Sequence, residues 1–246
     1  MASRSKRFEE ARTVIAVVKA LRLAKKLYSY RELSAFTGVR APTLSMYVSG
    51  RSMPSLETAK DILAGLLRLV DPRKRLAERL VETGGAVDTS SVLTEPLYLL
   101  MATIHFANLY RGRRVTRILV PEASGIPLAT SLSLELEVPF TLARRYPYKP
   151  AQSHEARHVC STSGPPFFCV ERDSIGRTDS VLIVDDIVET GRTLRALREI
   201  VEDRKASIAG VATLVVIGEE WMHESGISHV DTLIMLRKPA SRLPSM

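Results

Sequence analysis

Apolar residues recur at every third or fourth position along the N-terminal third of the chain, a spacing that is typical of amphipathic helices. The first such helix is predicted over residues 7–27, with apolar positions at Phe8, Ala11, Ile15, Val18, Leu21 and Ala24. Further helices are predicted over residues 30–36, 42–49 and, after the N-cap candidate Ser55, to about residue 70. The pattern therefore predicts a small all-α unit.

The chain changes character between residues 71 and 91. Asp71-Pro72 interrupts the helical pattern, a short charged helix is predicted over residues 73–82, and the small polar residues of 83–91 are typical of a linker. We therefore place a helical domain at residues 1–71, a linker at 72–90 and a second domain at 91–246.

From residue 92 onward, runs rich in β-branched residues alternate with helical patterns. Helices are predicted over residues 92–110, 126–135 and 193–203, and strands over 115–120, 138–143, 167–170, 181–185, 207–217 and 232–236. Residues 144–166, rich in Pro, Ser, His and basic side chains, are predicted to form a long loop. Apolar strands that alternate with helices favour an α/β fold, a mostly parallel sheet with helices on both faces.

Composition limits the classes of protein to consider. No apolar stretch reaches the length of a membrane span and the N-terminus has no apolar signal core, so a soluble cytoplasmic protein with no membrane partner is expected. The two cysteines, Cys160 and Cys169, form no CxxC and have no histidine at metal-ligand spacing. Neither a metal site nor a disulfide framework is indicated, although a single bridge between the two is chemically open.

The basic charge is concentrated in the helical domain. Residues 1–83 hold 17 Lys/Arg and 8 Asp/Glu, a net +9, whereas residues 84–246 hold 18 and 19, a net −1. This asymmetry indicates a polyanionic partner for the N-terminal part alone. A solvated basic face with no partner would have the same composition.

The segment Val181–Leu194 carries the strongest pattern for ligand chemistry. Four apolar residues lead to the pair Asp185-Asp186 at the end of a predicted strand, which is where open α/β sheets bind ligands. Adjacent carboxylates accept hydrogen bonds from the vicinal hydroxyls of a ribose. The turn Thr190-Gly191-Arg192-Thr193 then enters a helix, and its backbone N–H groups and hydroxyls fit a phosphate. A buried strand followed by an acidic turn is the alternative.

This segment resembles the signature of the type I phosphoribosyltransferases, in which an apolar run, two acids, two apolar residues, a variable residue and Thr-Gly precede a further Thr or Ser. The resemblance covers roughly residues 90–240. It implies the fold of that family and binding of 5-phosphoribosyl-1-pyrophosphate (PRPP) or a related nucleotide. It also implies Mg²⁺ carried with the diphosphate and a homodimer.

The resemblance assigns roles to two further segments. The turn Glu122-Ala123-Ser124-Gly125 resembles the pyrophosphate loop of the family, where backbone amides meet the diphosphate. Residues 144–166 lie where the family has a mobile loop that closes over the active site. The side chains expected to neutralise or cover pyrophosphate there are Arg144, Arg145, Lys149 and Tyr146. An ordinary strand-to-helix turn and a solvated charged loop are the alternatives.

Glu189 distinguishes between members of the family. Hypoxanthine-guanine enzymes carry an acid at the corresponding position, whereas adenine and orotate enzymes usually have a small residue. In a catalytic protein Glu189 would be a general acid or base, and Asp185 and Asp186 would lie beneath a ribocation-like transition state. The alternative is that Glu189 is a carboxylate at the start of a helix, where the helix dipole favours a negative charge. The base-binding end offers only Trp221 and residues 234–238, and a core position is expected for Trp221.

Residues 33–47 have the pattern of a helix-turn-helix. The small residue Ser34 lies four positions before Gly38, which supplies the positive φ of a tight turn, and Val39 and Leu44 take core positions. Gly50-Arg51 and the string Pro54-Ser55-Leu56-Glu57-Thr58 extend the match, so residues 8–70 resemble the DNA-binding domains of phage repressors of the Cro and C1 type.

Docking in the manner of those repressors would place two sets of side chains against DNA. The set facing the major groove is Arg40, Thr43, Ser45, Met46 and Ser49, and the set facing phosphates is Arg31, Arg51 and Ser52. Residues 1–52 contain 11 basic and 3 acidic residues, a net +8, which favours contact with backbone phosphate. RNA in place of DNA, or a bundle used only for protein contact, are the alternatives.

The fused modules favour a ligand-responsive transcriptional regulator. They resemble the bacterial purine repressor and archaeal regulators built on an orotate phosphoribosyltransferase-like domain. We expect ligand to order the 144–166 loop and to alter the spacing of two recognition helices in a dimer. Two alternatives stay open, a working phosphoribosyltransferase that makes a purine or orotate nucleotide, and a nucleic-acid-binding protein that acts outside transcription.

Overall fold

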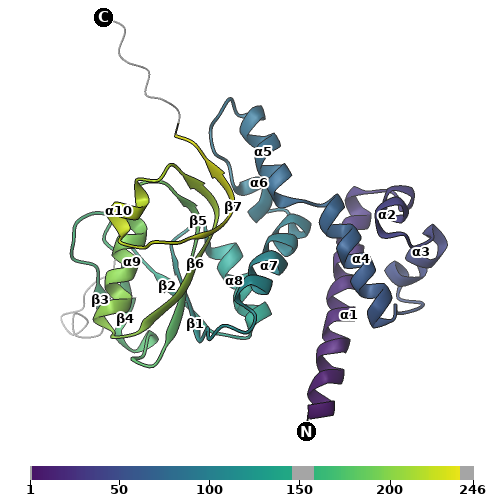
Figure 1. The fold of residues 1–246 in the computed structure, drawn as a ribbon, viewed down its shortest axis with the longest axis horizontal. Helices are drawn as coiled ribbons and strands as arrows, with labels where there is room; N and C mark the ends of the chain where they lie inside the picture. Colours follow the sequence, from purple (N-terminus) through teal and green to yellow (C-terminus); the bar gives the residue numbers. More distant parts are fainter. Residues whose placement is uncertain (1, 146–157, 239–246) are drawn as a thin grey trace, which may run out of the picture.

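The computed structural model describes residues 2–145 and 158–238 (Figure 1). Its N-terminal part consists of helices, α1 (Ala2–Leu27), α2 (Tyr30–Thr37), α3 (Ala41–Ser49) and α4 (Leu56–Leu69). The four helices predicted there are confirmed, and α1 begins earlier than the apolar spacing indicates. Gly38 ends α2 with a φ of 72°, the left-handed conformation that the tight turn of a helix-turn-helix requires.

Capping and packing explain where these helices begin and how they meet. The Ser55 hydroxyl accepts from Thr58 N at 3.1 Å, and Ser29 and Glu32 form a capping box at the start of α2. A single core closes the unit, with fully buried side chains that include Leu21, Leu33, Leu44, Ile62 and Leu66. Val39 packs against this core from its edge.

Three helices connect the two halves of the chain: α5 (Pro72–Glu82), α6 (Ser90–Leu93) and α7 (Pro96–Tyr110). The single helix predicted over residues 92–110 is therefore wrong. Pro96 occupies the first turn of α7, and the residue before it, Glu95, is extended with φ −94° and ψ 112°. Proline suits the first helical position but disfavours a helical conformation in the residue that precedes it, which separates α6 from α7.

Helix α7 contributes to two hydrophobic cores, one in each domain. Leu97 and Met101 are buried with the helical domain, whereas Phe106 and Tyr110 are buried beneath the sheet of the second domain. The division of the chain at residues 71 and 91 stays a prediction. The first turns of α7 lie beyond residue 91 in the sequence but pack with the helical domain.

The second domain is built on a five-stranded sheet in the order β2-β1-β5-β6-β7, in which every neighbouring pair is parallel. Its strands are β1 (Arg117–Pro121), β2 (Phe140–Ala143), β5 (Ser180–Val188), β6 (Ser207–Ile217) and β7 (Asp231–Leu236). The predicted α/β class is confirmed, with the ends of these strands shifted by at most three residues.

Helices cover both faces of this sheet (Figure 1). On one face lie α7 and α8 (Ile126–Leu136), and on the other lie α9 (Arg192–Asp203) and the short α10 (Trp221–Ser225). Side chains alternate along β5, so that Leu182 and Val184 enter the core with α7 and α8 while Val181 and Ile183 enter the core with α9. This double burial explains the continuous apolar run in the sequence.

A small hairpin stands beside the sheet; its first strand lies in the predicted 144–166 loop, and its second overlaps the strand predicted over residues 167–170. It consists of β3 (His158–Cys160) and β4 (Cys169–Glu171), followed by the 3-10 turn Arg172–Ser174. Cys160 lies directly opposite Cys169 and forms a disulfide with it, which is the single bridge that the sequence left open but did not favour. Directly opposed residues of antiparallel strands have their Cβ atoms close enough for the two sulfur atoms to bond. The sequence does not reveal this register, because β3 lies in residues predicted as a loop. No helix among the described residues is long and apolar enough to cross a membrane.

Gly65 sets the closest approach in the helical domain and supplies a test of its packing. A Cβ at this position would lie 2.5 Å from the Phe36 carbonyl oxygen, a backbone atom of α2. Gly65→Ala should therefore lower the free energy of unfolding by about 1–3 kcal/mol, although alanine is favoured over glycine in an open helix by about 1 kcal/mol.

Denaturant unfolding of the full chain measures this change. Gly176→Ala is the matched control, because its Cβ would meet Asp179 Oδ2 at 3.6 Å, an ordinary van der Waals contact. A Gly65→Ala protein as stable as the parent would contradict the close contact between α2 and α4.

Candidate functional site

The sheet opens a crevice between β1 and β5. The chain leaves β1 through α8 towards β2 on one side and leaves β5 through α9 towards β6 on the other. Pairing between β1 and β5 ends at Leu119 and Ile183, whereas β5 continues alongside β6 as far as Val188. Ligands of open α/β sheets bind where the strand order reverses in this way.

Two carboxylates occupy this crevice. Asp185 is 7% exposed and Asp186 is half-buried, and Asp186 N donates to Asp185 Oδ1 at 2.9 Å. Burial, and next the negative charge of Asp186, raise the pKa of Asp185 well above its ordinary value. The strand predicted to end at Asp185 extends to Val188, so both carboxylates lie within the end of β5 and not beyond it.

Two cavities of about 190 and 180 Å³ meet at Asp185, and both are also lined by Ile187 and Thr193. The first is completed by the turn at the start of α9, with Val188, Glu189, Thr190, Gly191 and Leu194. The second is completed by the turn after β1 and its neighbours, with Pro121, Glu122, Ala123, Ser124, Arg145, Phe168 and Asp186. The structure thus brings together the two turns that the sequence singled out.

The turn at residues 189–193 is held by a backbone contact. Gly191 has a φ of 80°, and a Cβ there would lie 2.6 Å from the Trp221 carbonyl oxygen. Trp221 is 1% exposed, in the core position expected for it. Glu189, Thr190 and Arg192 are exposed, and α9 begins at Arg192, so its first N–H groups face the cavity end of the turn.

The turn at residues 122–125 approaches the carboxylates from the opposite side. A Cβ on Gly125 would lie 3.1 Å from the Asp185 Cα atom, so the two segments touch through their backbones. Glu122 N donates to the Ala143 carbonyl at 2.9 Å, and Arg145 N donates to Glu122 Oε1 at 3.0 Å. The peptide bond between Glu122 and Ala123 is cis.

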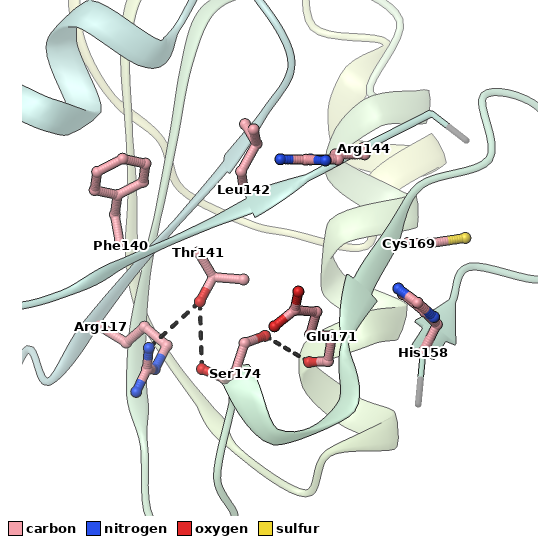
Figure 2. Close-up of a pocket in the computed structure, with 9 residues that line it drawn as sticks. All are labelled: Arg117, Phe140, Thr141, Leu142, Arg144, His158, Cys169, Glu171 and Ser174. Atoms are coloured by element: carbon pink, nitrogen blue, oxygen red, sulfur yellow. Dashed lines mark hydrogen bonds between the residues drawn. The ribbon is translucent and has the colours of Figure 1, made fainter. Parts of the chain in front are cut away.

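The predicted basic residues of the loop divide between two places. Arg145 lines the cavity with the carboxylates, whereas Arg144 lines a separate pocket of about 290 Å³ between β2 and the β3–β4 hairpin (Figure 2). That pocket shares no lining residue with the two cavities. Successive residues of an extended chain point to opposite sides, which explains the separation. Lys149 and Tyr146 lie outside the described residues.

Two contacts at the site and one at the loop have no counterpart in the sequence pattern. Thr89, from the segment predicted as a linker, donates its hydroxyl to Asp186 Oδ2 at 2.9 Å. Phe168 lines the second cavity, from a segment predicted only as a strand. Glu199 of α9 accepts from Thr162 N at 2.9 Å and from Ser163 N, which fixes the C-terminal end of the loop. Only the fold brings these residues to the carboxylates or the loop.

The proposed DNA-facing side chains form an accessible surface on α3 and its flanks. Arg31, Arg40, Met46, Ser49 and Arg51 are exposed, and Thr43, Ser45 and Ser52 are partly exposed. Leu44 and Tyr47 are buried and fix α3 on the core. Contact of this surface with nucleic acid stays a prediction.

Comparison with known sequences identifies both parts of the chain. Residues 99–238 match the phosphoribosyl transferase domain family, and residues 18–66 match a helix-turn-helix family. The chain belongs to the phosphoribosyltransferase family. Its N-terminal region is a helix-turn-helix domain of the kind expected from Gly38 and its neighbours.

Individual relatives agree with this assignment. A xanthine phosphoribosyltransferase of Brevibacillus brevis is 30% identical over 58% of this chain and 78% of its own length. An adenine phosphoribosyltransferase of Kosmotoga olearia is 31% identical over 52% and 75%. The crystal structure of an adenine phosphoribosyltransferase from Thermoanaerobacter pseudethanolicus superposes with a TM-score of 0.52, at 22% identity over 62% of this chain and 86% of that one. This last likeness concerns the fold alone.

The buried carboxylate of Asp185 makes the stability of the phosphoribosyltransferase domain depend on pH. Because its folded pKa is raised, the folded protein binds this proton more tightly than the unfolded chain, and stability falls as pH rises from the ordinary aspartate pKa through the raised one. Asp185→Asn should therefore raise Tm at neutral pH by several degrees, at about 2–4 °C per kcal/mol for a chain of this size.

Thermal unfolding at neutral pH and below the ordinary aspartate pKa separates this effect from others. The gain should vanish at the lower pH, where the aspartate is protonated in both states. Asp173→Asn, at an exposed aspartate, is the control. A lower Tm for Asp185→Asn at neutral pH would contradict a cost of burying the charge.

Proposed function

We propose that this protein is a transcriptional regulator in which PRPP, or a related nucleotide, binds the phosphoribosyltransferase domain and alters DNA binding by the helix-turn-helix domain. The observation that carries the proposal is helix α7, which is buried in both cores. A helix shared by two cores transmits a displacement of one domain to the other. A phosphoribosyltransferase that acts only on small molecules has no need of the basic α3 surface.

In this proposal the ligand spans the two cavities. The ribose hydroxyls donate to Asp185 and Asp186, and the 5-phosphate accepts from the N–H groups and hydroxyls of the turn that contains Thr190, Gly191, Arg192 and Thr193. The pyrophosphate meets the backbone of the turn that contains Glu122, Ala123, Ser124 and Gly125, beside Arg145. Arg144 and Lys149 complete the predicted basic set. Arg144 would have to move out of its present pocket to reach the pyrophosphate.

Mg²⁺ fits this site as a companion of the ligand. Among the described residues, no group of three His, Cys, Asp or Glu side chains is placed to hold a metal by itself. Mg²⁺ is usually bound by one or two carboxylates together with substrate phosphates and water, and the Asp185–Asp186 pair provides that number. Bound Mg²⁺ would neutralise the charge of the diphosphate.

On the DNA side, Arg40, Thr43, Ser45, Met46 and Ser49 face the major groove, and Arg31, Arg51 and Ser52 face phosphates. A homodimer would present two such surfaces to two half-sites, and ligand would change their spacing.

Catalysis is the second candidate function, because Glu189 lines the same cavity as the ribose-binding carboxylate Asp185. In a phosphoribosyl transfer to a purine, Glu189 would exchange the proton of the base, and the charge of the carboxylate pair would favour the ribocation-like transition state. The same contacts bind ligand in a regulator, so geometry alone supports both functions.

Titration of the purified protein with PRPP and Mg²⁺ distinguishes them. Orotate, hypoxanthine, xanthine, guanine and adenine are each added in parallel, and heat of binding and release of pyrophosphate are followed together. We expect saturable binding without release, and a changed affinity for duplex DNA selected by the protein from a random pool. Release with one base would make the protein an enzyme, and absence of binding would refute the ligand site. Binding that leaves DNA affinity unchanged would refute the regulator.

A further inference from the structure

Thr89 joins the carboxylate pair to the segment between the two domains. Its hydroxyl donates to Asp186 Oδ2 at 2.9 Å, and the residue is only 6% exposed. Val92 and Leu93, which follow in α6, are buried in the same core as Leu182 and Val184 of β5. Because α6 is anchored in this core, Thr89 is held in place against Asp186.

Asp88 continues the connection to α5. Arg79 Nε, on α5, donates to Asp88 Oδ2 at 2.8 Å, and Ser90 N donates to Asp88 Oδ1 at 2.9 Å. Hydrogen bonds from Ser90 and Arg79 lower the pKa of Asp88 to about 2. Only Val70 and Asp71 separate α4 from α5. Helix α5 alone therefore connects the Arg79–Asp88 ion pair to the end of the helical domain.

We infer that Thr89 is a positioning residue through which a ligand on Asp186 acts on α5 and the end of the helical domain. This inference rests on the proposed function, since it needs a ribose at the carboxylate pair. A ribose hydroxyl that donates to Asp186 uses the carboxylate that Thr89 already contacts, so the position of Thr89 and the occupancy of the site depend on each other. Coupling of this kind is reciprocal.

The test uses the full chain with PRPP and Mg²⁺, and measures calorimetric affinity and amide hydrogen exchange in α5 and residues 83–93. In the parent protein, PRPP should change the exchange of both segments. Thr89→Val removes the donor at constant size and should abolish the α5 response at saturating PRPP, with affinity weakened by about tenfold for one hydrogen bond to a charged group. Thr89→Ser keeps the donor and should restore both.

A second pair of variants tests the link away from the ligand. Arg79→Gln breaks the contact with Asp88 and should abolish the α5 response with no loss of PRPP affinity. Lys74→Gln is its matched control, since Lys74 lies on the same helix and pairs with Glu78 one turn away. An α5 response that persists in Thr89→Val and Arg79→Gln, or that is absent from a parent protein that binds PRPP, overturns the link alone. A parent protein that binds no PRPP overturns the proposed function itself.

A different observation concerns the exposed side of α1. Phe8, Ala11, Ile15 and Val18 are spaced alternately by three and four residues, and Phe8 and Ile15 are 64% and 61% exposed. They lie apart from Val17, Leu21 and Ala24, which enter the helical core. Two grooves of about 380 and 370 Å³ run along this stripe, and both are lined by Ile15 and Met53.

We propose that the α1 stripe pairs with the same stripe of a second copy of this chain. Alternating spacings of three and four are those of a helix that packs along another helix. Arg7 and Glu10 line the groove at one end of the stripe, and Lys19, Arg22 and Lys26 line the groove at the other. An antiparallel pair centred on Ile15 places Glu10 of one copy near Lys19 of its partner, which is the attractive contact, and Arg7 near Arg22, which makes the pairing sensitive to salt. This pairing would join two helix-turn-helix domains for two half-sites.

Sedimentation equilibrium of the full chain tests the pairing. Ile15→Glu should weaken the dimer at least tenfold, about 1.4 kcal/mol, whereas Leu134→Glu, at a 75% exposed residue of α8, should not. Glu10→Lys should weaken it, and adding Lys19→Glu should restore it. A parent protein that is monomeric, a dimer insensitive to Ile15→Glu, or a double variant no better than Glu10→Lys alone overturns the pairing.

Discussion

The site depends on one constraint, the early end of pairing between β1 and β5. Because β1 pairs with β5 only as far as Leu119 and then pairs with β2 alone, while β5 continues beside β6, the last residues of β5 face a crevice on the β1 side instead of a second neighbouring strand. Backbone contacts hold this crevice on both sides, Gly125 against Asp185 and Gly191 against Trp221. A side chain at Gly191 would force its turn away from Trp221, and one at Gly125 would press on the backbone of Asp185, so the geometry of the site is set largely by the main chain.

This arrangement buries a charge before any ligand is present. Asp185 is nearly inaccessible, its neighbour is a second carboxylate, and the cost of ionising it appears as a raised pKa. Hydroxyl donors from a ribose would replace the hydrogen bonds to water that the carboxylate has lost, so binding would recover part of that cost. A site that is less stable empty than filled is well suited to coupling ligand binding to a change elsewhere.

Sequence alone was sufficient for the parts of the structure that depend on local chemistry. The caps at Ser55 and Gly38, the apolar run of β5 and the two turns around Asp185 all follow from neighbouring residues, and each lies where its pattern predicts. Two of the misses depend on pairing in the fold that no local pattern shows. The disulfide needs the register of β3 and β4, and the contact of Thr89 with Asp186 joins residues 97 positions apart. The break between α6 and α7 was readable at Pro96, but the apolar pattern across it outweighed that one residue.

Whether such a site catalyses or regulates depends on whether the binding energy of the ligand stabilises a transition state or a change of conformation. A catalyst must contact the transition state more strongly than the substrate, which requires the base, the ribose and the pyrophosphate to be held in line. A regulator requires only that ligand contacts differ between two arrangements of the chain. Here the carboxylate that would hold ribose is also bonded to the segment that leads to the helical domain. Energy used to reposition that segment is not available to the transition state, and this favours regulation over turnover.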